Sequence, residues 1–383
     1  MLSAAETCAA ESILAAYVGT RLTVSTAELI WDRHHIVRLH LSGDDRSVVL
    51  KRRRKKNFGD RARGFDAELA ALEFLNGMET AIAPRLLGAD PAAGILIMED
   101  LGPGSSLADS LLARNGDQAE ADLVSYARAM GTMHAWSVSR SPEYTEIRAR
   151  HCRSAESSMD PDWINATAKG KAPFLALSAQ LGLPADGMSE EIDSLAALMG
   201  GSGYAGLVHS DLCPDNTHFL NGNCRLIDFE DSGWGPIALD VAYLLAPFPS
   251  CWCFASLPSQ AAGRALLAYR DQVANAGLDL GADWETALAA ALATSVVSRG
   301  AGIARALERD GKWGTTTMRP RLLTWLHSFI DTAARTGALP RLRSVAEIMR
   351  EELQRRWPDA DVPDYPALAR PGATLARFPE GGA

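Results

Sequence analysis

The sequence predicts an α+β fold of two lobes: a small N-terminal lobe of antiparallel strands with one helix, and a larger, mainly helical C-terminal lobe. Three observations lead to this prediction. β-branched residues alternate with polar ones between Arg21 and Lys51, apolar residues follow a helical spacing from Phe65 to Met78, and long alanine- and leucine-rich stretches dominate after residue 102. A chain of 383 residues is long enough for two such units.

The N-terminal lobe begins with strands. The segment RLTVSTAELIWDRHHIVRLHLSGDDRSVVLK contains alternating stretches, and its SGDD is a hairpin turn between two of them. The helix that follows ends near Asn76-Gly77. Two further strands flank a turn rich in Pro, Ala and Gly, and GPGSS forms a hinge to the next lobe. We therefore place the N-terminal lobe at residues 1–101 and the C-terminal lobe at 102–357.

The C-terminal lobe is helical apart from two strand-like segments, GLVHSDL and CRLIDF, which lie on either side of an Asn-Gly turn. Residues 255–357 have helical patterns throughout and no detectable internal repeat. The stretch 358–383 is rich in Pro, Gly and Ala, so we expect a loosely ordered tail there.

Composition disfavours several classes of protein. A net charge of -9 argues against a general affinity for nucleic acid or anionic membranes. No run of about eighteen apolar residues occurs, and the N-terminus lacks a basic segment before an apolar one, so we expect neither a membrane span nor a signal peptide. The six cysteines show no CxxC spacing and fit a reducing compartment. We expect a cytoplasmic protein, and its oligomeric state stays open.

Two aspartates and an asparagine in the stretch VHSDLCPDNTHFLNGNCRLID, residues 208–228, form a candidate cluster of oxygen donors. Asp211 and Asn216 follow the first strand and Asp228 ends the second, so a hairpin-like arrangement brings all three to one end. Such a cluster suits Mg²⁺, which is usually held by one or two carboxylates together with substrate phosphates. Asp211 is then left to orient or deprotonate a hydroxyl group.

The N-terminal lobe supplies a cation and a matching carboxylate. Lys51 ends the strand VVLK and lies on the face that it shares with Val49. Glu68 lies on or beside the apolar face of its helix, where an unpaired carboxylate is costly. A lysine partner removes that cost.

These segments together resemble the aminoglycoside phosphotransferase family of small-molecule kinases. The strand lysine, the helix glutamate, the EDLG connection, HSDLCPDN and LIDFE all occur in the family's order, over about residues 20 to 330. The protein is also similar in chemistry to choline kinases and protein kinases, which share the architecture. The resemblance therefore implies a protein-kinase-like fold and an enzyme that transfers a phosphoryl group to an alcohol.

The resemblance also implies a role for each matching residue. It makes Asp211 the catalytic base or hydroxyl-orienting group, and Asn216 and Asp228 ligands of Mg²⁺. The nucleotide is ATP or GTP, and Lys51 would contact its α- and β-phosphates. Glu68 would hold that lysine in position. The adenine would be bound by the backbone of Met98, Glu99, Asp100 and Leu101.

Two features of the sequence leave alternatives open. No GxGxxG loop precedes Lys51, and the corresponding turn reads WDRHH, so a nucleotide-binding pseudokinase or scaffold without transfer activity is an alternative. The acceptor is expected to be a small, cationic molecule with a hydroxyl group. Choline-, homoserine-, macrolide- and sugar-type acceptors are alternatives to an aminoglycoside. Acids of the helical region are candidates for its pocket: Asp283, Glu285, Glu308 and Asp310.

Other residues have simpler interpretations. His209 braces its loop rather than transferring protons, and Asp240 is either an anchor for that loop or a helix N-cap. The basic run from residue 52 to 56 is expected to be a solvated loop. Cys251 and Cys253 are expected to be packing residues, because no matching Cys or His lies nearby in the sequence; a bound metal is the alternative.

Overall fold

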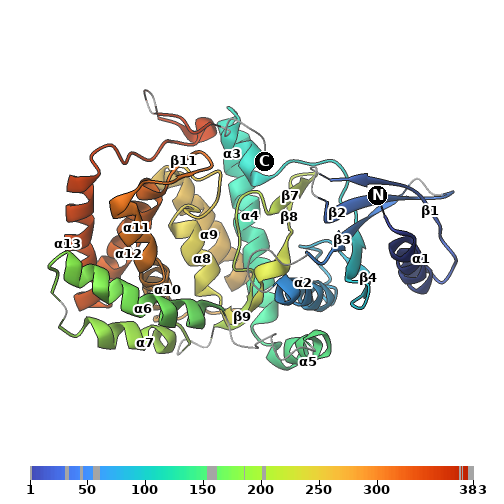
Figure 1. Ribbon diagram of the computed structural model, residues 1–383, viewed down its shortest axis with the longest axis horizontal. Coiled ribbons are helices and arrows are strands. Elements are labelled where there is room, and N and C mark those ends of the chain that lie inside the picture. The colour runs from blue at the N-terminus through green and yellow to red at the C-terminus, as the bar shows by residue number, and fades with distance from the viewer. Residues whose placement is uncertain are drawn as a thin grey trace.

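The computed structural model describes residues 2–30, 34–43, 46–54, 61–152, 162–184, 186–200, 204–370, 372 and 374–377. Figure 1 shows an antiparallel sheet near the N-terminus and a mainly helical remainder. The predicted α+β fold of two lobes is therefore confirmed. Residues 31–33 of the WDRHH turn and 44–45 of the SGDD turn lie outside the described residues.

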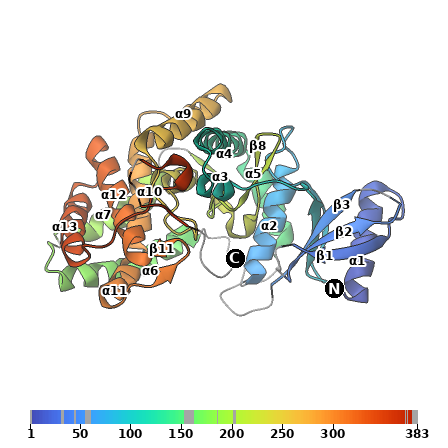
Figure 2. The same ribbon diagram turned by 90° about the horizontal axis from the view of Figure 1, so that it is seen from above.

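The N-terminal sheet has five antiparallel strands in the order β1-β2-β3-β5-β4. They are β1 (Val24–Leu29), β2 (Ile36–Leu41), β3 (Ser47–Arg52), β4 (Leu86–Asp90) and β5 (Ile95–Glu99). Val48 and Leu50 belong to an apolar cluster that includes Leu14 of helix α1 (Ala4–Val18). Lys51 points to the other face, where α2 (Arg61–Leu75) lies (Figure 2). This alternation directs the lysine into the interior of the molecule.

The N-terminal lobe contains two helices, which corrects the expectation of one. In α1, which the sequence analysis did not predict, a capping box joins Ser3 and Glu6, and Gly19 ends the helix with a φ of 79°. Its buried residues are Ala10 and Leu14, so its buried apolar face is small. The sequence signal that could have predicted this helix is the Ser-x-x-Glu spacing of its capping box, which stands at the start of an alanine-rich run.

The C-terminal lobe consists mainly of helices: α3 (Leu107–Leu112), α4 (Gly116–Ser137), α5 (Ser141–His151), α6 (Asp162–Gln180), α7 (Met188–Gly200), α8 (Ala238–Leu245), α9 (Ser259–Asn275), α10 (Trp284–Val297), α11 (Gly300–Glu308), α12 (Met318–Thr336) and α13 (Pro340–Arg356). The predicted helical region from 255 to 357 is confirmed, with a small hairpin of β10 (Lys312–Trp313) and β11 (Thr316–Thr317) inserted in it.

Helix α10 forms the centre of this lobe and packs against α7, α8 and α12. Residues 287–294 of this helix are all buried. In the described part of the chain, no single helix is long and apolar enough to cross a membrane. The pair α10 and α11, bent by 46°, passes that test by length and composition only.

The strands around the site pair differently from the expected hairpin. β6 (Ala205–Val208), which precedes Asp211, pairs with β9 (Gly233–Pro236). β8 (Asn223–Leu226) instead pairs with β7 (Thr217–Leu220) across the turn at Asn221 and Gly222. Both turn residues have positive φ, 52° and 77°, as a tight turn of this kind requires. Two separate two-stranded sheets therefore replace the single hairpin.

The segment after α13 is packed where the structure describes it, which differs from the loose order expected for residues 358–383. Tyr365 is fully buried. The backbone of Asp364 forms isolated bridges with Ser256 and Leu375, and its side chain pairs with Arg370 at 3.1 Å. A single buried tyrosine and these backbone bonds hold a segment whose composition alone suggested disorder. Residues 371, 373 and 378–383 lie outside the described residues.

Candidate active site

A buried ion cluster joins the two lobes. The Nζ of Lys51 in β3 lies 2.6 Å from Oε2 of Glu68 in α2 and 2.5 Å from Oδ1 of Asp228, which follows β8. The Lys51 and Glu68 side chains are 6% and 3% exposed, and that of Asp228 is 21% exposed. The sequence placed these three residues far apart along the chain, and the fold brings them into contact.

One ammonium in this cluster is shared by two carboxylates. Burial alone lowers the pKa of Lys51, but the charges of Glu68 and Asp228 outweigh it and hold the pKa above its usual value. Burial raises the pKa of Glu68, against the attraction of Lys51. Burial also opposes ionisation of Asp228, yet Lys51 lowers its pKa. Glu68, the more deeply buried of the two acids, is therefore the one that is protonated more easily, and Asp228 keeps its negative charge.

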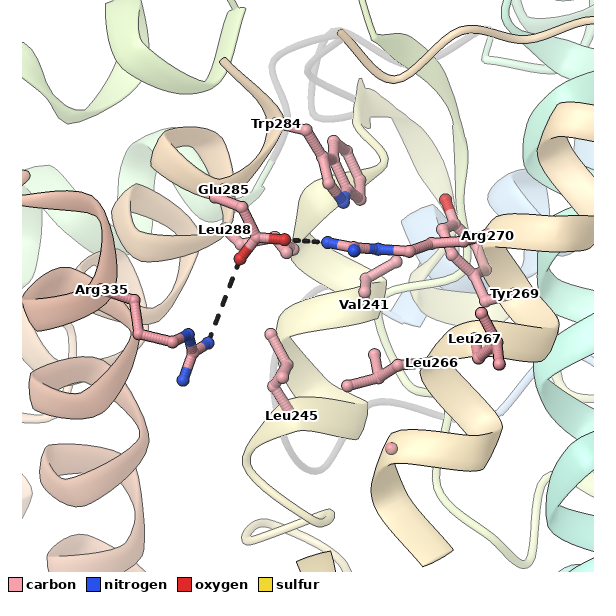
Figure 3. Close-up of a pocket in the computed structure, with 11 residues that line it drawn as sticks. Val241, Leu245, Leu266, Leu267, Tyr269, Arg270, Trp284, Glu285, Leu288 and Arg335 are labelled. Carbon is pink, nitrogen blue, oxygen red and sulfur yellow. Dashed lines mark hydrogen bonds and ion pairs between the residues drawn. The ribbon is translucent and has the colours of Figure 1, made fainter. Parts of the chain in front are cut away.

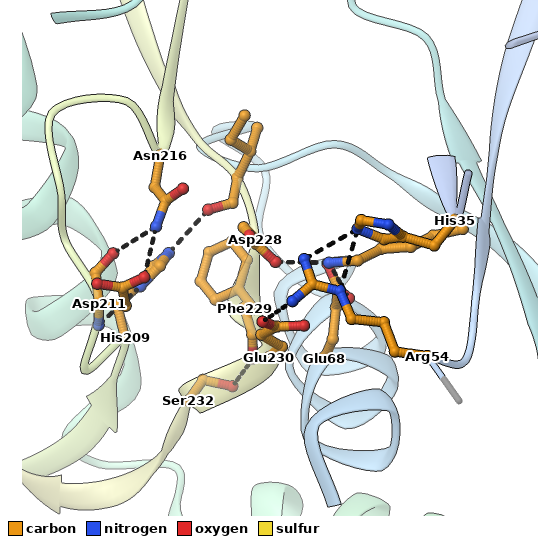
Figure 4. Close-up of polar contacts among 12 residues, drawn as sticks. His35, Arg54, Glu68, His209, Asp211, Asn216, Asp228, Phe229, Glu230 and Ser232 are labelled. Atoms are coloured by element: carbon orange, nitrogen blue, oxygen red, sulfur yellow. Dashed lines mark hydrogen bonds and ion pairs between the residues drawn. The ribbon is translucent and has the colours of Figure 1, made fainter. Parts of the chain in front are cut away.

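Asp211 and Asn216 face this cluster from the loop between β6 and β7 (Figure 4). Nδ2 of Asn216 donates to the backbone carbonyl of Asp211 at 2.8 Å and to its Oδ2 at 2.9 Å. Both bonds use the amide nitrogen, so Oδ1 of Asn216 is available as a ligand. Burial, followed by the charges of Asp231, Asp228 and Asp215, raises the pKa of Asp211 to about 7.

Asp240 anchors the loop that carries Asp211. It is buried in α8, and its carboxylate accepts hydrogen bonds from the backbone N–H groups of His209 at 2.8 Å and Ser210 at 3.0 Å. It also contacts Nε2 of His134 at 3.2 Å. Of the two roles considered for Asp240, the structure supports the anchor, and no side chain caps the start of α8.

His209 braces the same loop, as predicted. Its Nε2 lies 3.0 Å from the carbonyl oxygen of Ile227, and its Nδ1 accepts a hydrogen bond from the backbone N–H of Asp211 at 3.4 Å. Its ring packs against Phe229, with the centroids 4.5 Å apart. The histidine therefore connects the segment before Asp211 to the segment before Asp228.

The backbone is strained at two positions in the site. Ser210 has a φ of 67° and Asp228 a φ of 65°, in the left-handed region that L-residues rarely adopt. Ser210 directly precedes Asp211, and Asp228 itself contacts Lys51. Glycine would adopt the φ of Ser210 without this steric cost.

The four predicted adenine-binding residues lie at the end of β5 and the start of the connection between the lobes. Met98 pairs with Val49 and Leu86 in the sheet, and the backbone N–H of Glu99 donates to the carbonyl of Arg85 at 2.8 Å. The Asp100 carboxylate accepts from Nε of Arg38 at 2.5 Å, from Ser47 Oγ at 2.6 Å and from the Gly102 N–H at 3.0 Å. Asp100 thus fixes the connection, and Leu101 follows it directly.

The basic run is paired where it is described, which corrects the expectation of a solvated loop. Arg52 forms an ion pair with Glu6 at 2.6 Å, and Arg53 lies over the ring of Phe65. Arg54 contacts Glu230 at 3.2 Å, beside the ion cluster (Figure 4). These partners could not be predicted from the sequence, because they belong to three separate segments of the chain. Residues 55 and 56 lie outside the described part.

Of the four acids that were candidates for the acceptor pocket, Asp283 and Glu308 are exposed and the other two have partners elsewhere. Asp310 accepts hydrogen bonds from the backbone N–H groups of Met318 and Arg319 at the start of α12. Glu285 pairs with Arg270 and Arg335 at a cavity of about 360 Å³ that α8, α9, α10 and α12 line (Figure 3). None of the described residues of the ion cluster lines that cavity. Acids near Asp211 come instead from other segments, and they include Asp231 and Asp215, whose charges raise its pKa.

A comparison with known protein families shows to which family the chain belongs. The profile described as the phosphotransferase enzyme family, APH, matches residues 34–277, which is more than half of the chain. The chain belongs to the phosphotransferase enzyme family. The matched range includes every residue predicted for the site, from Lys51 to Asp228. The expected phosphotransferase with a hydroxyl acceptor is thereby confirmed.

The chain is also similar to several solved structures. A choline kinase from Cryptosporidium parvum is 13% identical, with a TM-score of 0.43, and the match covers 87% of this chain and 89% of that one. The gentamicin complex of APH(2″)-IIa is 15% identical, with a TM-score of 0.45 and coverage of 88% and 99%. A putative fructosamine-3-kinase from Thermobifida fusca is 17% identical, with a TM-score of 0.45 and coverage of 85% and 97%. No curated protein matches the chain.

Proposed function

We propose that this phosphotransferase moves the γ-phosphoryl group of ATP or GTP to a hydroxyl of a small, cationic molecule in the presence of Mg²⁺. The supporting observation is the contact of Lys51 with both Glu68 and Asp228, at 2.6 and 2.5 Å, beside the loop that carries Asp211. Phosphoryl transfer depends mainly on positioning and charge neutralisation, which such a cluster supplies.

In this proposal the N-terminal lobe binds the nucleotide. Lys51 contacts the α- and β-phosphates, and Glu68 holds the lysine in place from α2. The backbone between Met98 and Leu101 contacts the adenine, with Asp100 fixing that segment through Arg38 and Ser47. The ion pair between Arg54 and Glu230 ties the strand end beside Lys51 to the segment after Asp228.

Asp211 orients or deprotonates the acceptor hydroxyl. Its pKa, raised to about 7 by burial and neighbouring acids, makes the carboxylate a stronger base than an exposed aspartate. The hydrogen bonds from Asn216 fix its position, and Asp240 fixes the backbone before it. The acceptor loses its proton as its oxygen attacks the phosphorus of the γ-phosphoryl group, and the nucleoside diphosphate leaves.

The donor atoms of Asn216 and Asp228 fit Mg²⁺. Asn216 offers its amide Oδ1, and Asp228 offers a carboxylate whose Oδ1 contacts Lys51 and whose Oδ2 remains available. Hard oxygen ligands of this kind, one of them charged, are those that Mg²⁺ takes together with phosphate oxygens. When bound, the ion would neutralise charge on the β- and γ-phosphates.

The acceptor is proposed to be cationic because carboxylates surround Asp211. The charges of Asp231, Asp228 and Asp215 all raise its pKa, which reports a negative potential where the acceptor must approach. An ammonium group on the acceptor would be attracted there. Aminoglycoside-, choline- and homoserine-type molecules carry such a group, whereas neutral sugars do not. All six cysteines are free thiols, which suits our proposal of a cytoplasmic location.

The test is a transfer assay from Mg-ATP and Mg-GTP to a panel of aminoglycosides, amino alcohols, homoserine-like amino acids, macrolides and neutral sugars. We expect transfer to an amine-bearing class, from one or both nucleotides. Transfer to neutral sugars alone would overturn the cationic acceptor but keep the kinase. Nucleotide binding without transfer to any acceptor, or to water, would favour the pseudokinase suggested by the absence of a glycine-rich loop before Lys51.

A further inference from the structure

Three thiols and one carboxylate lie close together where the loop that carries Asp211 meets a segment that is distant in the sequence. Cys213 and Asp215 belong to that loop, and Cys251 and Cys253 belong to the segment after α8. Sγ of Cys213, Sγ of Cys251 and a carboxylate oxygen of Asp215 all lie within 4.8 Å of one another. Cys251 and Cys253 are buried, as expected of packing residues, and the fold also brings Cys213 and Asp215 to them from a distant part of the sequence.

We propose that Cys213, Asp215 and Cys251, with Cys253 as the fourth donor, form a binding site for a thiophilic divalent ion of the Zn²⁺ class. Zn²⁺ takes four ligands in a tetrahedron, and thiolate sulfur with carboxylate oxygen is a ligand set that it accepts. This site is distinct from the proposed Mg²⁺ ligands Asn216 and Asp228, which offer only oxygen. The proposal does not depend on phosphoryl transfer.

Three of the donors already lie within 4.8 Å of one another, and Cys253 adjoins them through Cys251. Sγ of Cys251 lies 3.4 Å from Oδ1 of Asp215 and 3.2 Å from Sγ of Cys253. Two thiolates on one tetrahedral Zn²⁺ are about 3.8 Å apart, given Zn–S bonds of about 2.3 Å. The two sulfurs of Cys251 and Cys253 therefore need to separate by only about half an ångström.

Neighbouring groups orient the donors. Nε1 of Trp252 donates to Oδ2 of Asp215 at 2.7 Å, which leaves Oδ1 facing Cys251. Arg321, 1% exposed, donates to the backbone carbonyls of Pro249 and Cys251 and holds that segment. Such outer partners are typical of metal sites. The guanidinium of Arg321 also offsets part of the negative charge that three thiolates and a carboxylate bring to one divalent ion.

The three thiols of the cluster are buried, and the ion would reach them past Asp215. Cys213, Cys251 and Cys253 are 8%, 1% and 0% exposed, whereas Asp215 is partly exposed and gives the ion a path of entry. Each thiol must lose its proton as its sulfur binds the ion, so up to three protons are released for each ion that binds. The bound ion would connect the loop of Asp211 to the segment that follows α8.

The experiment uses the full chain, reduced with a phosphine, and Co²⁺ as the spectroscopic probe. We expect one Co²⁺ per chain, an intense thiolate-to-cobalt charge-transfer band, displacement by Zn²⁺ and no displacement by excess Mg²⁺. Cys251→Ser and Cys213→Ser should weaken Co²⁺ binding by more than about 100-fold, beyond the loss typical of outer-sphere partners. Cys224→Ser is the matched control, because Cys224 is also a buried free thiol but lies in β8, and it should retain the band.

Each outcome decides the proposal. Absence of the charge-transfer band in the wild-type chain, or a band that Mg²⁺ removes, would overturn it. So would a band of unchanged strength in Cys213→Ser. If Cys251→Ser does not fold, as judged by near-ultraviolet circular dichroism, Cys213→Ser and Asp215→Asn carry the test, since both leave the segment held by Arg321 intact.

Discussion

Replacing Lys51 by methionine should destabilise the protein far more than replacing either acid that it contacts. The methionine keeps most of the volume of the lysine but removes the ammonium that Glu68 and Asp228 share at 2.6 and 2.5 Å. Two carboxylates then face each other without that cation, and the Glu68 side chain is 3% exposed. Breaking a buried ion pair from one side costs about 3–5 kcal/mol.

Glu68→Gln provides the comparison. Lys51 keeps Asp228 at 2.5 Å, and the glutamine carbonyl still accepts a hydrogen bond from the ammonium, so the loss should stay below about 2 kcal/mol. Lys171→Met is the surface control. Its partner Asp193 is 64% exposed, and such pairs contribute about 0–1 kcal/mol.

Urea denaturation followed by circular dichroism at neutral pH, without nucleotide or Mg²⁺, measures all three variants. The loss in Lys51→Met should shrink as the pH falls, because protonation of Glu68, whose pKa burial already raises, removes the repulsion. If Lys51→Met loses no more stability than Glu68→Gln, Lys51 is not the cation that holds the two acids together.

Three further variants test other parts of the structure. Asp240→Ala leaves the buried N–H of His209 and the part-buried N–H of Ser210 without their acceptor, so we expect a loss of at least about 2 kcal/mol and a lower kcat at nearly unchanged nucleotide KM, measured by denaturation and steady-state kinetics. Ser210→Gly relieves a φ of 67° and should raise stability by about 0.5–1 kcal/mol in thermal unfolding. Gly170→Ala places a Cβ 2.5 Å from Cα of Ser298 and should cost about 1–3 kcal/mol. Gly263→Ala, which meets nothing within 4 Å on α9, should instead gain up to about 1 kcal/mol and serves as its control.

The residues of the site could be predicted from the sequence because their chemistry restricts their identity. A buried carboxylate on α2 requires a cation, and Lys51 on β3 is the cation that the fold supplies at 2.6 Å. The order of strand lysine, helix glutamate and the two acidic loops resembles that of a family of small-molecule kinases, and this resemblance implied phosphoryl transfer.

The pairing of strands could not be predicted in the same way. Strand β9 reads Gly-Trp-Gly-Pro. It has no β-branched residues and no alternation of apolar and polar residues, so its sequence does not predict a strand that pairs with β6. Pairing depends on backbone hydrogen bonds between segments that side-chain patterns do not identify.

Helix α1 and the thiol cluster were missed for different physical reasons. In α1 the buried face consists of Ala10 and Leu14, too little apolar surface to give a clear period. Cys213 and Cys251 approach each other only because the segment after α8 folds back onto the loop of Asp211. Contacts of that kind depend on the tertiary structure, so local patterns in the sequence do not predict them.

The central claim is that Asp211 acts on the acceptor hydroxyl while Lys51 and its partners bind the nucleotide. The most direct test is a single-turnover measurement of phosphoryl transfer with Asp211→Asn, together with the Kd of Mg-ATP. Asparagine keeps the volume of the side chain and can still accept the hydrogen bond from Asn216. We expect transfer to fall by about 100-fold or more, with the Kd nearly unchanged. Transfer at the wild-type rate would contradict the account and remove Asp211 from the mechanism.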